Sequence, residues 1–191
     1  MPRETTFTKA MVVEAATRLV AESGIQALSA RNVAAQLGAS TAPIYASVGS
    51  IEALREAVIE SATAQLRAYT LKPWSERPFL NEGAGLVVFA REQPRLFALL
   101  FLTPEIAAES VPKVYAHLLA DMTGEPRFSK LTVSERDAVL ERMWFVALGM
   151  ATLAYSGQLR NPTTHGIVTE LLEAGLVLIP DAVARVRGKK P

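Results

Sequence analysis

Residues able to perform catalysis or hold a metal ion are few and scattered in this chain of 191 residues. His117 and Asp121 lie four positions apart, so one helix face would present both, but the only other histidine, His165, brings no further pair of ligands. A solvated or ligand-facing His117 is the simpler interpretation. Cysteine is absent, and serine, histidine and aspartate lack the spacing of a nucleophilic triad. We therefore expect no enzyme activity, no metal site and no cofactor.

Contact with a phosphate backbone is the second chemistry that the residue types allow. Tyr45 carries a hydroxyl that can donate to a phosphate, and Arg31 lies where a helix begins. Thr41, Ala42 and Pro43 stand early in the next helix, where Ala42 and Pro43 offer only apolar contact, such as with a thymine methyl. The alternative is that Arg31 is solvated and the Tyr45 ring packs in its own domain. For Tyr45 both interpretations hold if the ring packs and the hydroxyl points outward.

Two short helices and a tight turn must position these side chains. Val33 and Leu37 fall on one helical face, and Gly38 ends that helix because glycine adopts the positive φ required after a helix C-terminus. Ser40 can then cap a second helix that turns Ile44 inward. Two short helices joined by a brief glycine-containing turn form a helix-turn-helix, whose second helix enters the DNA major groove.

A third helix precedes this pair. Thr8 can cap it, Gly24 ends it, and its apolar residues recur with the spacing of one helical face. Ser29 can cap the helix that follows. The three helices would enclose a small apolar core, which is marginal for a segment of roughly 50 residues and needs support from the rest of the chain.

The order and spacing of these parts resemble the tetracycline-repressor (TetR) family of bacterial transcription regulators. The resemblance runs from about Thr8 to Leu54. The chain departs from the family at Ile51, where a lysine that contacts phosphate is usual, and at Val48, where a bulky aromatic residue is common. The residues that carry the resemblance are Gly24, Val33, Ala34, Leu37, Gly38, Ile44, Tyr45 and the capped segment from Ser50 to Leu54.

The charge of this N-terminal head is nearly balanced. Its first 55 residues contain five basic and four acidic side chains, and the net charge of the whole chain is +1. Electrostatic affinity for DNA should therefore be modest per subunit, and a dimer with two heads would compensate. The residues that we place at the DNA interface are Thr8, Ser29, Arg31, Ser40, Thr41, Ala42, Pro43, Tyr45 and Ser50.

Beyond the head the sequence predicts a helical body. A long helix from Ile51 to about Tyr69 would join the two parts. After a proline-containing break, we expect a helix from Phe79 to Glu92 and a short apolar one from Pro94 to Phe101. A further helical region runs from Pro104 to Met122, with a division near Pro112.

Two long helices complete the body. Thr132 and Glu135 match a capping box, in which each side chain satisfies a backbone N–H, so a helix should run from Thr132 to Tyr155. Asn161 followed by Pro162 predicts the start of another helix that continues to about Leu178. Pro180 then separates a short basic tail, which we interpret as solvated.

The resemblance implies a homodimer formed by the helices from Thr132 to Tyr155 and from Asn161 to Leu178, packed as a four-helix bundle. Their length and apolar content agree with this expectation. The small residues Gly149, Thr152 and Ser156 recur along one face and permit close approach of a second copy.

Large apolar residues of the body are candidates for a ligand cavity, which the resemblance also implies. An ordinary helical core would look the same in sequence, and for any single residue the core is the more frequent outcome. The candidates are Phe89, Phe97, Leu100, Phe101, Tyr115, Leu118, Met122, Trp144 and Leu148.

Composition bears on location. Hydrophobic residues make up 50% of the chain and the mean hydropathy is +0.20, consistent with surface buried against a second copy or around a cavity. The longest apolar run, Trp144 to Tyr155, is too short for a bilayer, which takes about 20 residues. The N-terminal residues, Arg3 and Glu4 among them, do not form the apolar segment of a signal peptide. We expect a cytoplasmic protein with no membrane partner.

These observations predict an all-α protein with two domains, a helix-turn-helix DNA-binding head over residues 1–50 and a helical ligand-binding and dimerisation domain over residues 51–191. The resemblance implies a repressor that leaves double-stranded operator DNA when a small-molecule effector binds the body. The alternative is a non-catalytic helical binding protein, or an enzyme, that merely begins with a helix-turn-helix-like segment. Such a protein would show cargo binding or turnover without operator binding.

Overall fold

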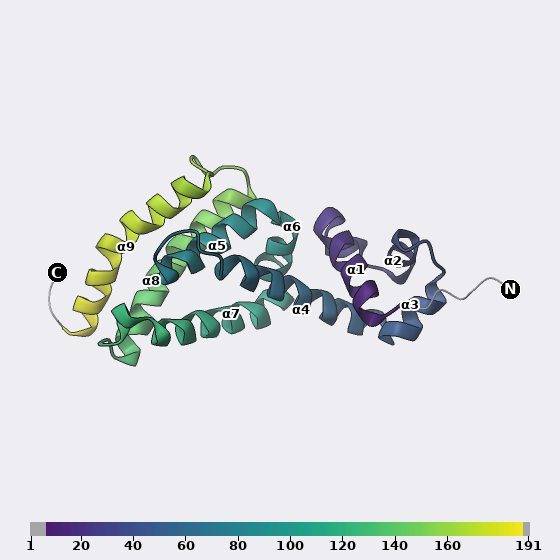
Figure 1. The fold of residues 1–191 in the computed structure, drawn as a ribbon, viewed down its shortest axis with the longest axis horizontal. Coiled ribbons are helices and arrows are strands. Elements are labelled where there is room, and N and C mark those ends of the chain that lie inside the picture. The colour runs from purple at the N-terminus through teal and green to yellow at the C-terminus, as the bar shows by residue number, and fades with distance from the viewer. Residues whose placement is uncertain (1–6, 189–191) are drawn as a thin grey trace.

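The computed structural model describes residues 7–188, and these residues form helices and connecting turns with no β-strand. Figure 1 shows an elongated molecule with a small head at the N-terminal end, a larger body at the other, and α4 (Ile51–Thr70) running from one to the other. The predicted all-α class, with a helix-turn-helix head and a helical body, is confirmed. Arg3 and Glu4, like Lys189 and Lys190 of the basic tail, lie outside the described residues.

The head consists of α1 (Lys9–Ser23), the short 3-10 turn η1 (Ile25–Ala27), α2 (Ala30–Gln36) and α3 (Thr41–Val48). Its core is formed by apolar side chains that the helical spacing predicts, and Val12, Val33 and Ile44 are completely buried. Because α1 also packs against α4 and α6 (Pro94–Phe97), the small head core is continuous with the body.

α4 joins the head to the body along one apolar stripe. Ser50 caps its start, and Leu54, Val58 and Leu66 are buried along its length. Its far end crosses α5 (Pro78–Glu92) at Gly85, where an added Cβ atom would overlap the carbonyl oxygen of Tyr69. Glycine is therefore required there by the close approach of the two backbones.

α5 is the central helix of the body. It contacts α4, α8 (Val133–Tyr155) and α9 (Thr164–Val186), and from Ala84 to Ala90 every residue is buried. Polar side chains fix the loop before it, because the Trp74 indole donates to Tyr69 O at 2.7 Å and Ser75 N–H donates to Asn81 Oδ1 at 2.7 Å.

The segment after α5 differs from the predicted short helix. α6 ends at Phe97 and continues as one π-helical turn, η2 (Ala98–Leu102). α7 (Pro104–Gly124) then runs without the division predicted at Pro112, and the 3-10 turn η3 (Pro126–Phe128) follows it. Pro112 and Ala108 are both exposed, so the carbonyl that loses its N–H partner at Pro112 faces solvent and the helix continues.

The capping box at the start of α8 is confirmed. Thr132 N–H donates to Glu135 Oε2 at 2.7 Å, and Glu135 N–H donates to Thr132 Oγ1 at 3.2 Å. The Glu135 carboxylate also pairs with Arg187 near the end of α9. These contacts connect the first turn of α8 to the last turn of α9, so the two helices are held together by polar bonds as well as by their apolar faces.

Both predicted boundaries of the last helix are wrong. It begins at Thr164, not at Asn161 and Pro162, because Thr163 is the cap and its hydroxyl accepts the Gly166 N–H at 3.0 Å. The Asn161 side chain instead lies against Gly166, where a Cβ atom would overlap it. At the other end α9 passes through Leu178 and Pro180 to Val186. The carbonyl released by Pro180 belongs to the exposed Leu176, so solvent can satisfy it.

By length and composition α8 alone among the described helices would be long enough and apolar enough to cross a membrane. The apolar run from Trp144 to Tyr155, which the sequence analysis considered, is shorter than this helix, because α8 starts at Val133. The inner side of α8 packs against α5 and α9, and Val139, Ala147 and Ala151 are buried there. The helix thus serves as a packed element of this body, with one side left at the surface.

Candidate nucleic-acid interface

The turn between α2 and α3 sets the direction of the second helix. Gly38 follows α2 with φ of 63°, and its N–H donates to Ala35 O at 3.2 Å. Ala39 N–H donates to Ala34 O at 2.9 Å. This pair of bonds is a Schellman motif, and because a side chain strains the backbone at positive φ, the turn depends on glycine at position 38.

α3 turns one side into the head and the opposite side to solvent. Ile44 is completely buried, whereas Thr41, Ala42, Tyr45 and Ala46 are exposed. Residues spaced by three or four positions share a helical face, and such spacings link these four residues into one continuous stripe. Ala46 is the member that the sequence analysis did not name, and its spacing of four from Ala42 is the signal that points to it.

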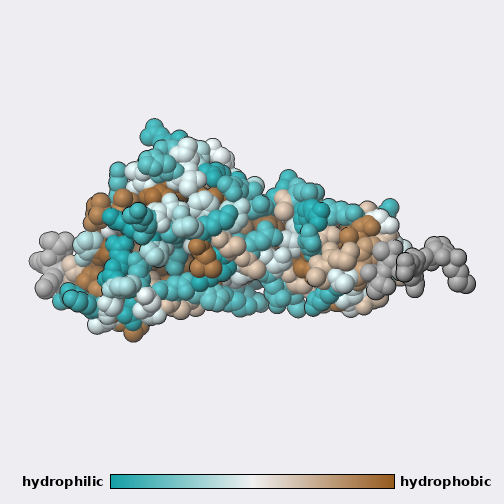
Figure 2. Space-filling view, viewed as in Figure 1, coloured by the Kyte–Doolittle hydropathy of each residue, from teal (hydrophilic) through white to brown (hydrophobic). Residues whose placement is uncertain are grey.

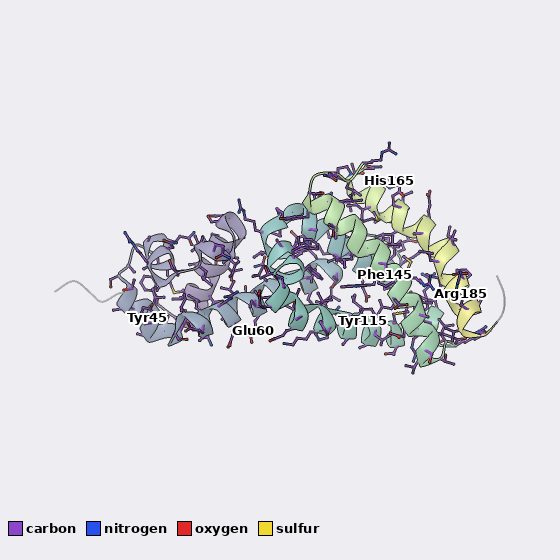
Figure 3. The ribbon with its side chains drawn as sticks, turned by 180° about the vertical axis from the view of Figure 1, so that it is seen from behind. Tyr45, Glu60, Tyr115, Phe145, His165 and Arg185 are labelled. Atoms are coloured by element: carbon purple, nitrogen blue, oxygen red, sulfur yellow. The ribbon has the colours of Figure 1, made fainter. Side chains whose placement is uncertain are left out.

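Tyr45 is the largest side chain of this stripe. It is 48% exposed, and Figure 3 places it on the head, at the end of the molecule remote from the body. About half of the side chain is covered by its own domain, as expected if the ring packs and the hydroxyl reaches outward. A phenol hydroxyl in this position can donate to a phosphate oxygen.

Three of the predicted contact residues have a role inside the head. The hydroxyl oxygens of Thr8, Ser29 and Ser50 each accept the backbone N–H three residues later, at 3.3, 3.2 and 3.1 Å. They cap α1, α2 and α4 as predicted. A hydroxyl that accepts one bond keeps its own proton to donate, so capping leaves each of them a possible phosphate contact.

Ser40 differs from these three caps. It occupies the N-cap position of α3, but its side chain accepts no N–H from the helix that it precedes. Arg31 is exposed in the first turn of α2, and Pro43 is half-buried in the first turn of α3, where its missing N–H would have no partner within the helix. Arg31 and Pro43 therefore lie in the helix positions that the sequence predicts, each in the first turn of its helix.

The two departures from the TetR pattern lie where the head meets α4. Ile51 is the first residue of α4, and Val48 is the last residue of α3. Both are half-buried and pack against the hydrophobic core. An apolar side chain at position 51 therefore contributes packing at a point where a lysine would extend toward solvent.

The head has the parts of a DNA-reading domain: a glycine turn, an exposed stripe on α3, and a capped fourth helix, α4, that leads into the body. Residues 12–58 match the family described as bacterial regulatory proteins, tetR family. The head is a TetR-family DNA-binding domain. The matched segment extends from Val12 in α1 to Val58 in α4, so it covers the whole core of the head and the first turns of the linking helix. No curated protein matches the chain.

This TetR match makes the protein a DNA-binding transcriptional regulator, since the matched segment is the family's helix-turn-helix. Family members of this kind are generally not enzymes. Among residues 7–188 no group of three or more histidine, cysteine, aspartate or glutamate side chains is arranged to hold a metal ion. His117 is exposed on a groove between α4 and α7, and Asp121, its predicted neighbour, turns to Arg67 of α4 with a separation of 2.6 Å.

The nine predicted pocket residues are mostly ordinary core. Phe89, Phe97 and Leu100 are completely buried, and Phe101 stacks on Phe97 with ring centroids 4.9 Å apart. Met122 is also buried, and Leu148 is half-buried against the core.

Tyr115 connects two helices. Its ring meets Trp144 edge to face with centroids 5.8 Å apart, and its hydroxyl donates to Asp137 Oδ1 at 3.1 Å. Figure 3 labels it on α7 beside α8. Burial, and then the bond to Asp137, raises the pKa of the Tyr115 hydroxyl, so it remains a neutral donor.

One cavity, of about 30 Å³, lies among α5, α7, α8 and α9. Leu118 and Trp144 are the two predicted residues that line it. The sequence analysis missed Glu82, which also lines it and is the one ionisable group to do so. The available signal was its position, because Glu82 is the only charged residue between Phe79 and Ala90.

Proposed function

We propose that this protein is a homodimeric repressor that binds operator DNA through two α3 helices and leaves it when a small molecule binds the body. The observation that carries the proposal is the double attachment of α4. Its first turns pack in the head, where Leu54 and Val58 are buried, and its last turn is held against α5 at Gly85. A change in the body that moves α4 would move the head with it.

The direction of control follows from linkage. A ligand shifts the protein between two arrangements only if it binds one of them more tightly, and operator DNA must prefer the other. α1 offers a second connection, because the Arg95 side chain of α6 lies beside Gly24 at the C-terminal end of α1. We expect the division between the two domains at residues 50 and 51, with α4 as the moving link.

Dimerisation is proposed through the outer sides of α8 and α9. Phe145 on α8 is 61% exposed, and Leu176 and Val177 on α9 are 64% and 70% exposed. Figure 2 shows hydrophobic residues on the α9 side of the body, at the upper left. Exposed apolar groups of this size are typical of a protein interface.

Small residues continue this surface along α8. Gly149, Thr152 and Ser156 are exposed, and a Cβ atom added at Gly149 would meet no other atom within 4 Å. A second copy could therefore approach the α8 backbone closely. A two-fold pairing of α8 and α9 would place two heads on one DNA molecule, as inverted half-sites require.

The competing function is a helical carrier or enzyme whose head does not read DNA. The exposed α3 stripe and the TetR match favour a regulator, and we place the protein in the cytoplasm, where its DNA lies. A gel-shift titration with the DNA upstream of its own gene separates the two. Binding that survives an excess of unrelated competitor DNA is expected, and equal binding to both DNAs would favour the competing function.

A further inference from the structure

The cavity of the body has an apolar wall with a single carboxyl in it. Leu86, Leu118, Trp144 and Leu171 are among its lining residues, and Glu82 is the only ionisable one. Its volume of about 30 Å³ is enough for about two water molecules, or for the end of an alkyl chain. Most apolar cavities carry no carboxyl, because burying a polar group without a partner is unfavourable.

Glu82 also borders a second, open space on the other side. A cleft of about 520 Å³ lies between the ends of α4, α5 and α7, and Glu82 is part of its lining. The ionisable groups that line this cleft are all carboxyls, those of Glu82, Asp121 and Glu125. One side chain thus stands between an apolar cavity and an acidic cleft.

The Glu82 carboxyl is poorly satisfied by its neighbours. Its Oε2 atom is buried and has no hydrogen-bond partner of good geometry within residues 7–188; the side chain that can share a proton with it is another carboxyl, that of Asp121. Arg67, the cation that acts on the pKa of Glu82, is 2.6 Å from Asp121, and Arg127 lies 3.6 Å from Glu125. Each of the other two carboxyls therefore pairs with its own arginine, whereas Glu82 forms no ion pair in the described part of the chain.

Because Glu82 lacks the ion pair that Asp121 and Glu125 each have, it is the carboxyl of this site that holds a proton. Burial, and then the Asp121 charge, raises the pKa of Glu82 to about 8, with a smaller contribution from Glu125, and Arg67 opposes the rise. At neutral pH Glu82 therefore carries a proton for most of the time. The two arginines then balance Asp121 and Glu125, and an incoming cation would find an acid ready to ionise.

We propose that the body binds slender amphipathic organic cations, with the cationic group against Glu82 in the acidic cleft and the apolar end in the cavity. The inference rests on the proposed ligand-responsive function and names its ligand class. On binding, the O–H bond of Glu82 breaks, the proton leaves to solvent, and the carboxylate pairs with the cation. An anionic ligand would instead meet three carboxyls.

The same site has a direct connection to α4. Arg67 belongs to α4 and Asp121 to α7, and their ion pair is adjacent to Glu82. A cation between Glu82 and Asp121 competes with Arg67 for the Asp121 carboxylate. Ligand binding would in this way act on the helix that carries the head.

The test uses three six-carbon compounds of one shape and different charge: hexylamine, hexanol and hexanoate. Calorimetric titration of the full chain, without DNA at pH 7, should show hexylamine bound about tenfold or more tightly than hexanol, with hexanoate weakest. Glu82→Gln should lower the hexylamine affinity by about tenfold and leave hexanol unchanged. Glu60→Gln, on the exposed side of α4 in Figure 3, is the matched control and should change neither.

Proton release supplies an independent readout. Between pH 6 and 8 the affinity for hexylamine should rise by up to about tenfold per unit, because Glu82 must lose its proton, and the rise should stop above the pKa of about 8. Titration in two buffers of different ionisation heat should give close to one proton released. If Glu82→Gln does not fold, as judged by its melting curve, Glu82→Met, of similar volume and uncharged, replaces it.

Three outcomes overturn the inference: no preference among the compounds, a hexylamine affinity that Glu82→Gln does not change, or no binding of any of them. Operator binding is measured separately, so the two proposals fail separately. Glu82-dependent hexylamine binding that leaves operator affinity unchanged supports the ligand class and contradicts ligand-responsive regulation. Operator release by another class of compound, without hexylamine binding, supports ligand-responsive regulation and contradicts the proposed ligand class.

Discussion

At the residue scale, the proposed contact with DNA includes the hydroxyl of Tyr45, a side chain that the fold leaves half-exposed on the head. Tyr45→Phe keeps the half-exposed ring and removes only the hydroxyl, the proposed donor to phosphate. We expect operator binding to weaken by about 1.5–3 kcal/mol, the value of a hydrogen bond to a charged group, with an unchanged melting temperature. Fluorescence anisotropy with operator DNA measures this.

A tyrosine of the body provides the control for this change. Tyr115→Phe removes a hydroxyl of the same kind that bonds to Asp137, far from the head, and should leave DNA affinity as it is. Equal DNA affinity of Tyr45→Phe and wild type, with both proteins folded, would remove Tyr45 from the interface.

Ile51 allows a test of the departure from the family pattern. It is half-buried against the core, so Ile51→Lys should lower the free energy of unfolding by about 1 kcal/mol, roughly half the value of a fully buried side chain. The slope of log affinity against log salt should then stay unchanged. A slope steeper by about 0.9 per added contact, in a protein of unchanged melting temperature, would instead place position 51 on phosphate. Ile51→Met keeps the volume and should behave as wild type.

The candidate site shows which residues sequence reasoning can and cannot find. The second helix of the helix-turn-helix was predictable because Gly38 and Ile44 follow local rules for turns and helix faces. Glu82 was not singled out, because its chemistry depends on the distant Arg67 and Asp121, which only the folded body brings next to it. The sequence shows only that Glu82 is the one charged residue between Phe79 and Ala90, and its charged neighbours come from distant parts of the chain.

At the element scale, the capping box of α8 predicts a dependence of stability on pH. The bond from Arg187, and then that from the Thr132 N–H, lowers the pKa of Glu135 from 4.5 to about 2. In this window the unfolded chain binds more protons than the folded one, so stability contributed by Glu135 is present above pH 4.5 and lost as pH falls toward 2.

Glu135→Gln tests this contribution. The glutamine amide oxygen can still accept the Thr132 N–H, but the negative charge that pairs with Arg187 is removed. We expect a lower melting temperature than wild type at pH 7, and a gap that closes between about pH 4.5 and 2. The exposed Glu173→Gln on α9 should show only a small gap at every pH. A Glu135→Gln gap that stays constant down to pH 2 would contradict the assignment.

Helix starts were predicted better than helix interruptions. A capping hydroxyl directly before an apolar periodic segment predicts the start of four helices, at Thr8, Ser29, Ser50 and Thr132. Prolines at 112 and 180 were expected to divide helices and do not, because each released carbonyl lies on an exposed face where water can replace the lost N–H. Which face is exposed follows from tertiary packing, so local propensity does not decide it.

At the scale of the whole molecule, the outer surface of α8 and α9 should determine oligomeric state. Val177→Glu places a charge on the most exposed apolar residue of α9, and a two-fold interface would bring two such charges together. Sedimentation equilibrium at micromolar concentration should give a dimer for wild type and a monomer for the variant.

Leu71→Glu is the matched control for the dimer test. Leu71 is 63% exposed but follows the end of α4, away from α8 and α9, and its variant should remain a dimer. A monomeric wild type, or a Val177→Glu dimer of unchanged strength, would contradict the proposed interface.

Selection of DNA from a random pool tests most directly the claim that two heads on one dimer read an operator. Purified wild-type protein is incubated with the pool, and the bound molecules are amplified and sequenced over several rounds. The two-fold arrangement predicts enriched sequences that share an inverted repeat, with half-site centres about 10 base pairs apart or a multiple of this. Sequences no different from the input pool, or a single half-site with no repeat, would contradict it.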